Sequence, residues 1–278
     1  MIKAVLIKDL YSFPGNPFKV TENEEMEELT ESIRNYGVIT PFVVRPRKEG
    51  GYEIIAGHRR KAACEKAGIE KVPAFVREMD RDEAVIALVD SNLHREHILP
   101  SERAFAYKMK LEAIKHQGKQ TSVQVEQKLS REVVADEAGE SQSKVQRYIR
   151  LTNLLPELMQ LVDEGRIAVS PAVELSYLSE DEQRDLLETI DTEEATPNLS
   201  QAQRMKKQSM ETGICADDIF NILSEEKANQ REQIKLPMSA VKRFFPESYT
   251  VRQMQDLIIR LLEDYQRRRE RTRHEPER

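Results

Sequence analysis

The residues best suited to chemistry follow an apolar run at Ile54–Ala56. Gly57 comes next, followed by His58 and the two arginines Arg59 and Arg60. The apolar run predicts a strand, the glycine a turn, and the alanine-rich stretch after it a helix. Backbone N–H groups at a helix start lack intrahelical partners and favour phosphate, and arginine can bind phosphate oxygens bidentately. This spacing therefore predicts an anion-binding turn, and the alternative is a strand-to-helix turn whose arginines are solvated.

A second cluster of polar residues lies between two apolar-periodic stretches, from Asp90 to Glu96. It offers carboxylates, the amide of Asn92, an imidazole and the guanidinium of Arg95. Because Mg²⁺ takes oxygen ligands and retains waters, these side-chain types can hold a hydrated Mg²⁺ beside a phosphate. A solvated loop between two helices is the alternative.

A third group, in the middle of the chain, has the pattern helix, glycine turn, helix. The turn Gly139 to Ser141 separates Val133–Ala138 from Gln142–Leu151. This is the arrangement of a helix-turn-helix, here at about 131–151, and an ordinary helical hairpin is the alternative. Its outer residues can reach base edges and phosphates; they are Ser141, Gln142, Ser143, Lys144, Gln146 and Arg147.

The elements that would position these residues alternate strands and helices over the first hundred positions. One helix is predicted to begin at a capping box of Thr21 and Glu24 and to end at Gly37. Apolar alternation and β-branched runs predict the strands, and one-sided apolar spacing predicts the helices. The predicted strands are 2–7, 42–45, 52–55 and 72–76, and the other helices are 82–89 and one that starts at Pro100.

Beyond residue 100 the pattern is helical. We predict an α+β N-terminal domain at 1–100, an all-α domain at 101–212 and a linker with a C-terminal helical segment at 213–278, so that the chain is mainly α. The last helix has a capping box of Thr250 and Gln253 and an apolar stripe too wide to be buried by one helix. It should pack on the preceding segment or on a second copy. The stripe is Val251, Met254, Leu257, Ile258, Leu261, Leu262 and Tyr265.

Composition narrows the functions that the chain can have. Its 278 residues suffice for two or three domains, and its net charge is -6. This acidic total argues against a general polyanion binder, so DNA binding would have to come from the local motif. Cys64 and Cys215 lie far apart, which indicates neither a zinc site nor a disulfide framework. We find neither an apolar run of membrane-span length nor a signal-peptide pattern, and expect a cytoplasmic protein without membrane contact.

Together these residues resemble the ParB family of chromosome and plasmid partition proteins over roughly residues 16–210. The Gly57 turn is similar to the family's Gly-Glu-Arg-Arg block, and Ser91 to Glu96 to its Glu-Asn-Leu-Gln-Arg-Glu block. Four blocks in the family's order are much more specific than any one alone. They are Asn16–Phe18 with Ser32, Ile33 and Gly37–Arg45, then Gly57–Arg60, then Ser91–Glu96, and Gly139–Glu157.

The resemblance implies a sulfiredoxin-like N-terminal fold and a DNA clamp. Such a clamp is a homodimer that loads at a specific double-stranded DNA site through its helix-turn-helix, binds CTP with Mg²⁺, closes and slides. A ParA-type ATPase is a further partner of the family, which one sequence does not identify. By resemblance, the nucleotide site comprises Gly57, His58, Arg59, Arg60 and Arg95, and Asn92 holds Mg²⁺ with Asp90 as a substitute ligand.

Two positions depart from the family pattern, and both are acidic there. His58 stands where the family usually has a Glu associated with hydrolysis, and Ser91 where it has a Glu near the metal. Nucleotide binding is therefore better supported than turnover, and CTPase activity and its catalytic residues are left open. Two other functions also stay open: an ATP-using enzyme of the sulfiredoxin or small-molecule-kinase type, which needs no helix-turn-helix, and a transcriptional regulator with a vestigial nucleotide pocket.

Overall fold

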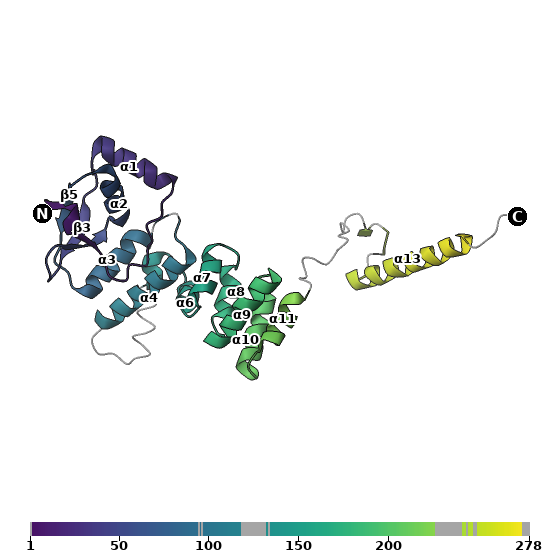
Figure 1. The fold of residues 1–278 in the computed structure, drawn as a ribbon. Coiled ribbons are helices and arrows are strands. Elements are labelled where there is room, and N and C mark those ends of the chain that lie inside the picture. Colours follow the sequence, from purple (N-terminus) through teal and green to yellow (C-terminus); the bar gives the residue numbers. More distant parts are fainter. Residues whose placement is uncertain are drawn as a thin grey trace. The chain divides into compact units, whose positions relative to one another are not determined.

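The computed structural model describes residues 2–93, 95, 97–117, 132, 134–225, 241–242, 244–246 and 249–273. The chain divides into two units, Met1–Glu225 and Glu226–Arg278, and each is described by itself (Figure 1). Among the described helices, none combines the length and apolarity needed to cross a membrane.

A five-stranded mixed sheet forms the N-terminal domain, with the strand order β1-β5-β3-β4-β2. The pairs β1–β5 and β3–β4 are antiparallel, whereas β3–β5 and β2–β4 are parallel. A short 3-10 helix, Ile7–Asp9, separates the first two strands. The strands are β1 (Ile2–Leu6), β2 (Leu10–Ser12), β3 (Phe42–Pro46), β4 (Tyr52–Ala56) and β5 (Lys71–Val76).

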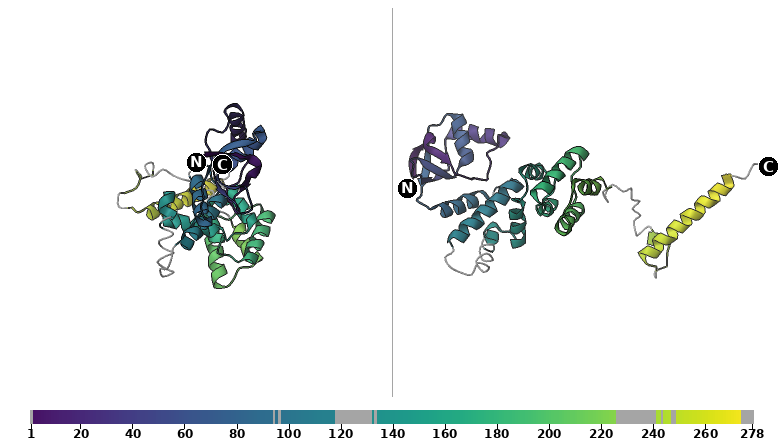
Figure 2. Two further views of the ribbon diagram at one scale, coloured as in Figure 1. Left: turned by 90° about the vertical axis from the view of Figure 1, so that its left-hand side faces the viewer. Right: turned by 60° about the horizontal axis from the view of Figure 1, so that its bottom comes forward.

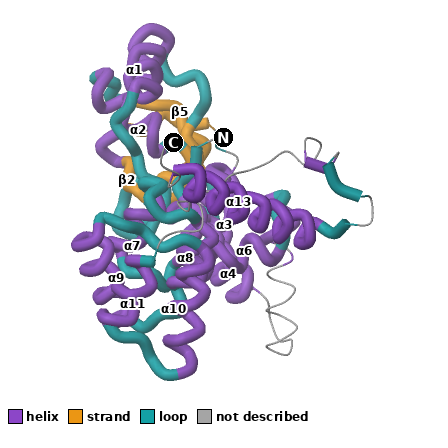
Figure 3. Tube along the Cα trace, turned by 90° about the vertical axis from the view of Figure 1, so that its right-hand side faces the viewer, coloured by secondary structure: helices purple, strands orange, loops and turns teal. Residues whose placement is uncertain are grey.

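Helices cover both faces of this sheet (Figure 3). Successive residues of a strand point to opposite faces. Accordingly, Ile54 joins a core with α1 (Glu24–Tyr36) and α2 (His58–Ala67), whereas Ile55 joins a second core with α3 (Arg81–Leu93). The predicted α+β class of this domain is confirmed, and each predicted strand and helix of it is present.

Two predicted helix boundaries are wrong. The N-cap of α1 is Asn23, whose side-chain oxygen accepts a hydrogen bond from the backbone N–H of Met26 at 3.1 Å, so Thr21 and Glu24 do not form the capping box. Helix α3 does not stop at Val89 but continues to Leu93. The first part of the predicted polar loop is therefore the last turn of a helix, because Leu88 and Asn92 bury side chains on the same face.

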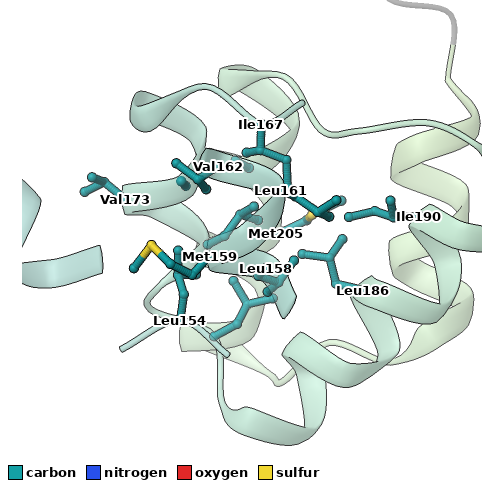
Figure 4. Close-up of a cluster of buried hydrophobic side chains, with 14 of the residues drawn as sticks. Leu154, Leu158, Met159, Leu161, Val162, Ile167, Val173, Leu186, Ile190 and Met205 are labelled. Atoms are coloured by element: carbon teal, nitrogen blue, oxygen red, sulfur yellow. The ribbon is translucent and has the colours of Figure 1, made fainter. Parts of the chain in front are cut away.

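The second part of the first unit is all-helical, as predicted (Figure 2). Its core centres on α7, where Leu158 is fully buried against Leu186 and Met205 (Figure 4). Ile219 and Leu223 of α11 belong to the same core, so the helical region continues past residue 212, the predicted boundary. The helices are α4 (Pro100–Gln117), α6 (Gln142–Leu151), α7 (Pro156–Asp163), α8 (Val169–Leu175), α9 (Glu180–Glu193), α10 (Leu199–Glu211) and α11 (Ala216–Ser224).

The helix-turn-helix is present in the part that the structure describes. Residues 134–138 are helical, Gly139 turns with φ +64°, and Ser141 caps α6 by accepting from the N–H of Lys144 at 3.2 Å. Val145 is fully buried and packs with Val134 and Tyr107 of α4. The predicted motif begins at about residue 131, and residues 118–131 and 133 lie outside the described residues.

The second unit contains α13 (Val251–Arg273). Its predicted capping box is confirmed, since the N–H of Thr250 donates to Gln253 Oε1 at 2.8 Å and the N–H of Gln253 donates to Thr250 Oγ1 at 3.4 Å. Met254 of the predicted stripe is buried, whereas Leu261, Leu262 and Tyr265 are exposed. Much of the described part of the stripe is thus uncovered in a single chain.

One buried ammonium group connects three helical segments of the first unit. The side chain of Lys110 on α4 has no solvent exposure and forms ion pairs with Asp90 of α3 and, at 2.5 Å, with Glu137 of the helical residues 134–138. The two carboxylate side chains are 45% and 49% exposed, so water solvates them while the ammonium depends on them.

This asymmetry predicts which change destabilises the fold. The double variant Asp90→Asn with Glu137→Gln leaves a buried ammonium without a counter-charge and should lose about 3 kcal/mol of unfolding free energy. Lys110→Met keeps the apolar stem and frees two solvated carboxylates, so it should lose less than about 1 kcal/mol. Urea unfolding followed by circular dichroism measures both, and equal losses would contradict this account.

Candidate functional site

The strand–turn–helix at which the sequence predicts an anion site is present between β4 and α2. Gly57 has φ +126°, and a Cβ at this position would lie 2.6 Å from Cδ1 of Phe42, which is closer than real Cβ contacts. Only glycine fits both the backbone angle and the space. Helix α2 starts directly after it, and its first-turn N–H groups have no partners within the helix.

A cavity of about 600 Å³ lies over this turn and brings together the first two predicted clusters. Gly57, Arg59 and Arg60 of the first cluster line the cavity, together with Asn92 and Arg95 of the second cluster. The rest of the lining is Glu25, Glu28, Leu29, Ser32, Ala56 and Ser91, and the two glutamates are acidic side chains that we did not anticipate there.

Two of the three arginines of the cavity, Arg60 and Arg95, lie against aromatic rings. The Nη1 group of Arg60 donates to the carbonyl oxygens of Thr40 and, at 3.0 Å, Pro41, and its guanidinium lies 5.0 Å from the ring centre of Phe42. Arg95 lies 5.6 Å from the ring centre of Phe18. Burial, and next the charge of Arg59, lower the pKa of Arg95 below its ordinary value. An anion in the cavity would relieve this crowding of positive charge.

The two predicted metal ligands, Asn92 and Asp90, lie in different surroundings: Asn92 lines the cavity and Asp90 does not. Asn92 is only 3% exposed, and its Nδ2 donates to the carbonyl oxygen of Leu88 at 2.7 Å and to Ser91 Oγ at 3.1 Å. Since the nitrogen makes both bonds, Oδ1 lies on the opposite side of the amide group. Asp90 is not part of the cavity lining and pairs with Lys110, so its geometry does not support a substitute metal ligand. Within the described ranges, no group of three or more His, Cys, Asp and Glu side chains could hold a metal ion.

His58 is the first residue of α2, directly after Gly57, and is not part of the cavity lining. Its side chain is buried, and Nε2 has no hydrogen-bond partner within the described structure. Burial, followed by the charges of Arg95 and Lys61, lowers the pKa of His58 to about 4. The imidazole is therefore neutral near pH 7, and a charged contact between His58 and a ligand is not available in this conformation.

The predicted DNA-reading residues share one exposed surface of α6 and its cap. Arg147 donates from Nη2 to Ser170 Oγ at 2.7 Å, which places the start of α8 beside α6. Lys144 pairs with Glu140 at 2.6 Å, an acidic neighbour that the sequence did not reveal as a partner. All six residues are exposed: Ser141, Gln142, Ser143, Lys144, Gln146 and Arg147.

Comparison with protein families gives two matches in the chain. Residues 1–93 match the ParB N-terminal domain, and residues 100–211 match the ParB HTH domain. A nucleoid occlusion protein of Halalkalibacterium halodurans is 34% identical over 207 residues, which cover 74% of this chain and 67% of that protein. A probable chromosome-partitioning protein ParB of Pseudomonas putida is 34% identical over 169 residues, 61% of this chain and 54% of the relative. The chain thus spans about half the length of the latter.

Two crystal structures of C-terminally truncated ParB from Caulobacter crescentus are also similar. The complex with the centromeric parS site is 24% identical, with a TM-score of 0.46, and the match covers 74% of this chain and 99% of that one. The complex with CTP-gamma-S is 29% identical, with a TM-score of 0.33, and covers 66% and 96% respectively.

The lowered pKa of His58 predicts how stability depends on pH. In the unfolded chain the pKa of His58 is 6.5, and in the folded chain it is about 4. Between these two pH values His58 therefore binds a proton in the unfolded chain but not in the folded one. The contribution of His58 is therefore complete above pH 6.5 and declines as the pH falls toward 4, by about 3 kcal/mol in all. Unfolding free energies of wild type and His58→Gln between pH 7 and 4 test this: the wild-type slope should be steeper, and parallel slopes would refute it.

Proposed function

The chain belongs to the ParB family, and we propose from this membership that it is a site-specific DNA-binding partition protein that acts as a CTP- and Mg²⁺-dependent clamp. The observation that carries the proposal is the cavity at Gly57, where Arg59, Arg60, Asn92 and Arg95 meet. The same chain presents an exposed polar and basic face on α6. An anion site and a DNA-reading face in one unit fit a nucleotide-regulated DNA binder better than an ATP-using enzyme of similar N-terminal fold.

In this proposal the N–H groups at the start of α2 and the three arginines bind the triphosphate. Arg60 is the best fixed of them, because two backbone carbonyls and the Phe42 ring already hold its guanidinium. The amide oxygen of Asn92 would be a protein ligand for Mg²⁺. One amide together with phosphate oxygens and waters fits an ion that is usually bound by few protein groups. When bound, Mg²⁺ would neutralise charge on the phosphates.

We propose binding without fast turnover. The position that the family uses for an acidic side chain holds His58, which is buried, neutral and outside the cavity lining. It cannot act there as a carboxylate base. Nucleotide can still drive closure, because closure requires only that the closed form bind CTP more tightly than the open form.

The partners are also part of the proposal. Specific double-stranded DNA would contact the exposed face of α6, a second copy of the chain would cover the exposed stripe of α13, and a ParA-type ATPase would act with the complex. We place this protein on the nucleoid or a plasmid in the cytoplasm. A nucleoid occlusion role is the second candidate, because a relative with that name is similar over 74% of this chain.

The nucleotide part of the proposal predicts selective binding of CTP. Isothermal titration with Mg²⁺ should show tighter binding of CTP than of ATP by the wild type. Arg60→Ala should lose about 1.5–3 kcal/mol of binding free energy, because charge-assisted hydrogen bonds are removed. Phosphate release should be slow or absent. Absence of CTP binding, or a clear preference for ATP, would refute the clamp, whereas fast release would refute only the role given to His58.

The DNA part predicts two kinds of effect on α6. Changing a residue that reads bases, such as Gln142, to alanine should remove roughly 1–3 kcal/mol of discrimination between the specific site and other sequences. Lys144→Ala should weaken binding to all sequences alike and reduce the salt dependence. Fluorescence anisotropy separates these effects when binding is measured to a duplex selected for tight binding by the wild type and to a scrambled duplex of the same composition. If the triple variant Gln142→Ala, Lys144→Ala, Arg147→Ala binds its site as wild type does, this face is not the DNA contact.

A further inference from the structure

The anion cavity contains negative charge of its own. Glu25 and Glu28 project from α1 into the lining, opposite the turn that carries Arg59 and Arg60. The Oε2 atom of Glu25 lies 2.9 Å from Nη2 of Arg59, which is a direct charge-assisted hydrogen bond. The Glu25 carboxylate thus pairs with the guanidinium to which a phosphate would bind.

We propose that Glu25 competes with the ligand for Arg59. Its carboxylate pairs with Arg59 when no ligand is bound, and the incoming phosphate chain must displace it. The inference rests on the proposed function, because it concerns the same nucleotide site. It assigns to Glu25 the role of setting the affinity threshold of that site.

The position of the ion pair supports this role. A second cavity of about 620 Å³ adjoins the first, and Glu25, Arg59 and Arg95 line both. The Glu25–Arg59 pair therefore lies at the boundary between the two cavities. Displacement of Glu25 from Arg59 would join the two cavities along Arg59. In this proposal, the motion that frees the guanidinium for phosphate would also enlarge the space for the rest of a nucleotide.

The structure also indicates that the displacement is easy. The side chains of Arg59 and Glu25 are 31% and 56% exposed, so water screens their attraction and can solvate the released carboxylate. In contrast, Nε of Arg59 is buried without a hydrogen-bond partner within the described structure, so this end of the guanidinium gains if a ligand oxygen reaches it. The competition is therefore weak enough to be overcome by a multivalent anion.

The test compares two glutamines in one cavity. Glu25→Gln removes the competing charge and should bind CTP with Mg²⁺ about threefold to fivefold more tightly than wild type, the range expected for an exposed ion pair. Glu28→Gln is the matched control, because it removes the same charge from the same cavity without touching the Arg59 pair. Its affinity should change less than twofold. Isothermal titration measures all three chains, and their unfolding curves verify the fold.

The outcomes separate this inference from the proposed function. If wild type binds CTP and Glu25→Gln binds it equally or more weakly, the competitor role is refuted while the nucleotide site stands. An equal gain in Glu28→Gln would also refute it, because general charge would then explain both. If none of the three proteins binds CTP, the proposed function fails. Titration with inorganic triphosphate, which has no nucleobase, then tests the role of Glu25: tighter binding by Glu25→Gln than by wild type supports it, and equal or weaker binding refutes it.

Discussion

The structure depends on the close contact between Gly57 and Phe42. Phe42 is fully buried in the core beneath the sheet, and its ring leaves no room for a Cβ on the turn above it. The same ring also lies against the guanidinium of Arg60, 5.0 Å from the ring centre. A core residue thereby fixes both the backbone at the start of α2 and the best-held cation of the cavity. The apolar core of the domain and the chemistry of its site therefore share one side chain.

Helix α4 links this domain to the helical region. The backbone N–H and hydroxyl of Ser101 donate to the Asp163 carboxylate at 2.9 and 2.5 Å, so a residue of α7 satisfies the start of α4. Glu102 accepts from the N–H groups of Lys19 and Leu99, at 2.7 and 3.2 Å, and lines the second cavity. Along the same helix, Tyr107 packs on the helix-turn-helix. One helix thus contacts the cavity region, the α7 core and the helix-turn-helix.

Sequence patterns predicted the features that are local in the chain. The strand–turn–helix at Gly57 and the capping box of Thr250 and Gln253 each depend on neighbours within a few residues, and both are confirmed. The cap of α1 was misplaced because Thr21 and Asn23 are both good capping residues and the pattern does not choose between them. Glu25 was missed for a different reason. It is 34 residues from Arg59, and only the packing of α1 against α2 brings the two together. The structure does not support Asp90 as a metal ligand, because on the last turn of α3 its side chain pairs with Lys110 and is not part of the cavity lining.

The charges in the cavity explain why an acidic chain can hold an anion site. Three arginines meet two glutamates in its lining, so the local excess of positive charge is small although the guanidiniums are crowded. Such a site neither needs a strongly basic chain nor attracts every polyanion. Under the proposed function, a nucleotide with Mg²⁺ would bring several negative charges and a compensating cation together, so displacement of one carboxylate would leave the cavity near neutrality. A buried, neutral His58 fits the same logic. A carboxylate at that position would add a third negative charge beside the arginines, whereas an uncharged imidazole leaves their charge available to the ligand.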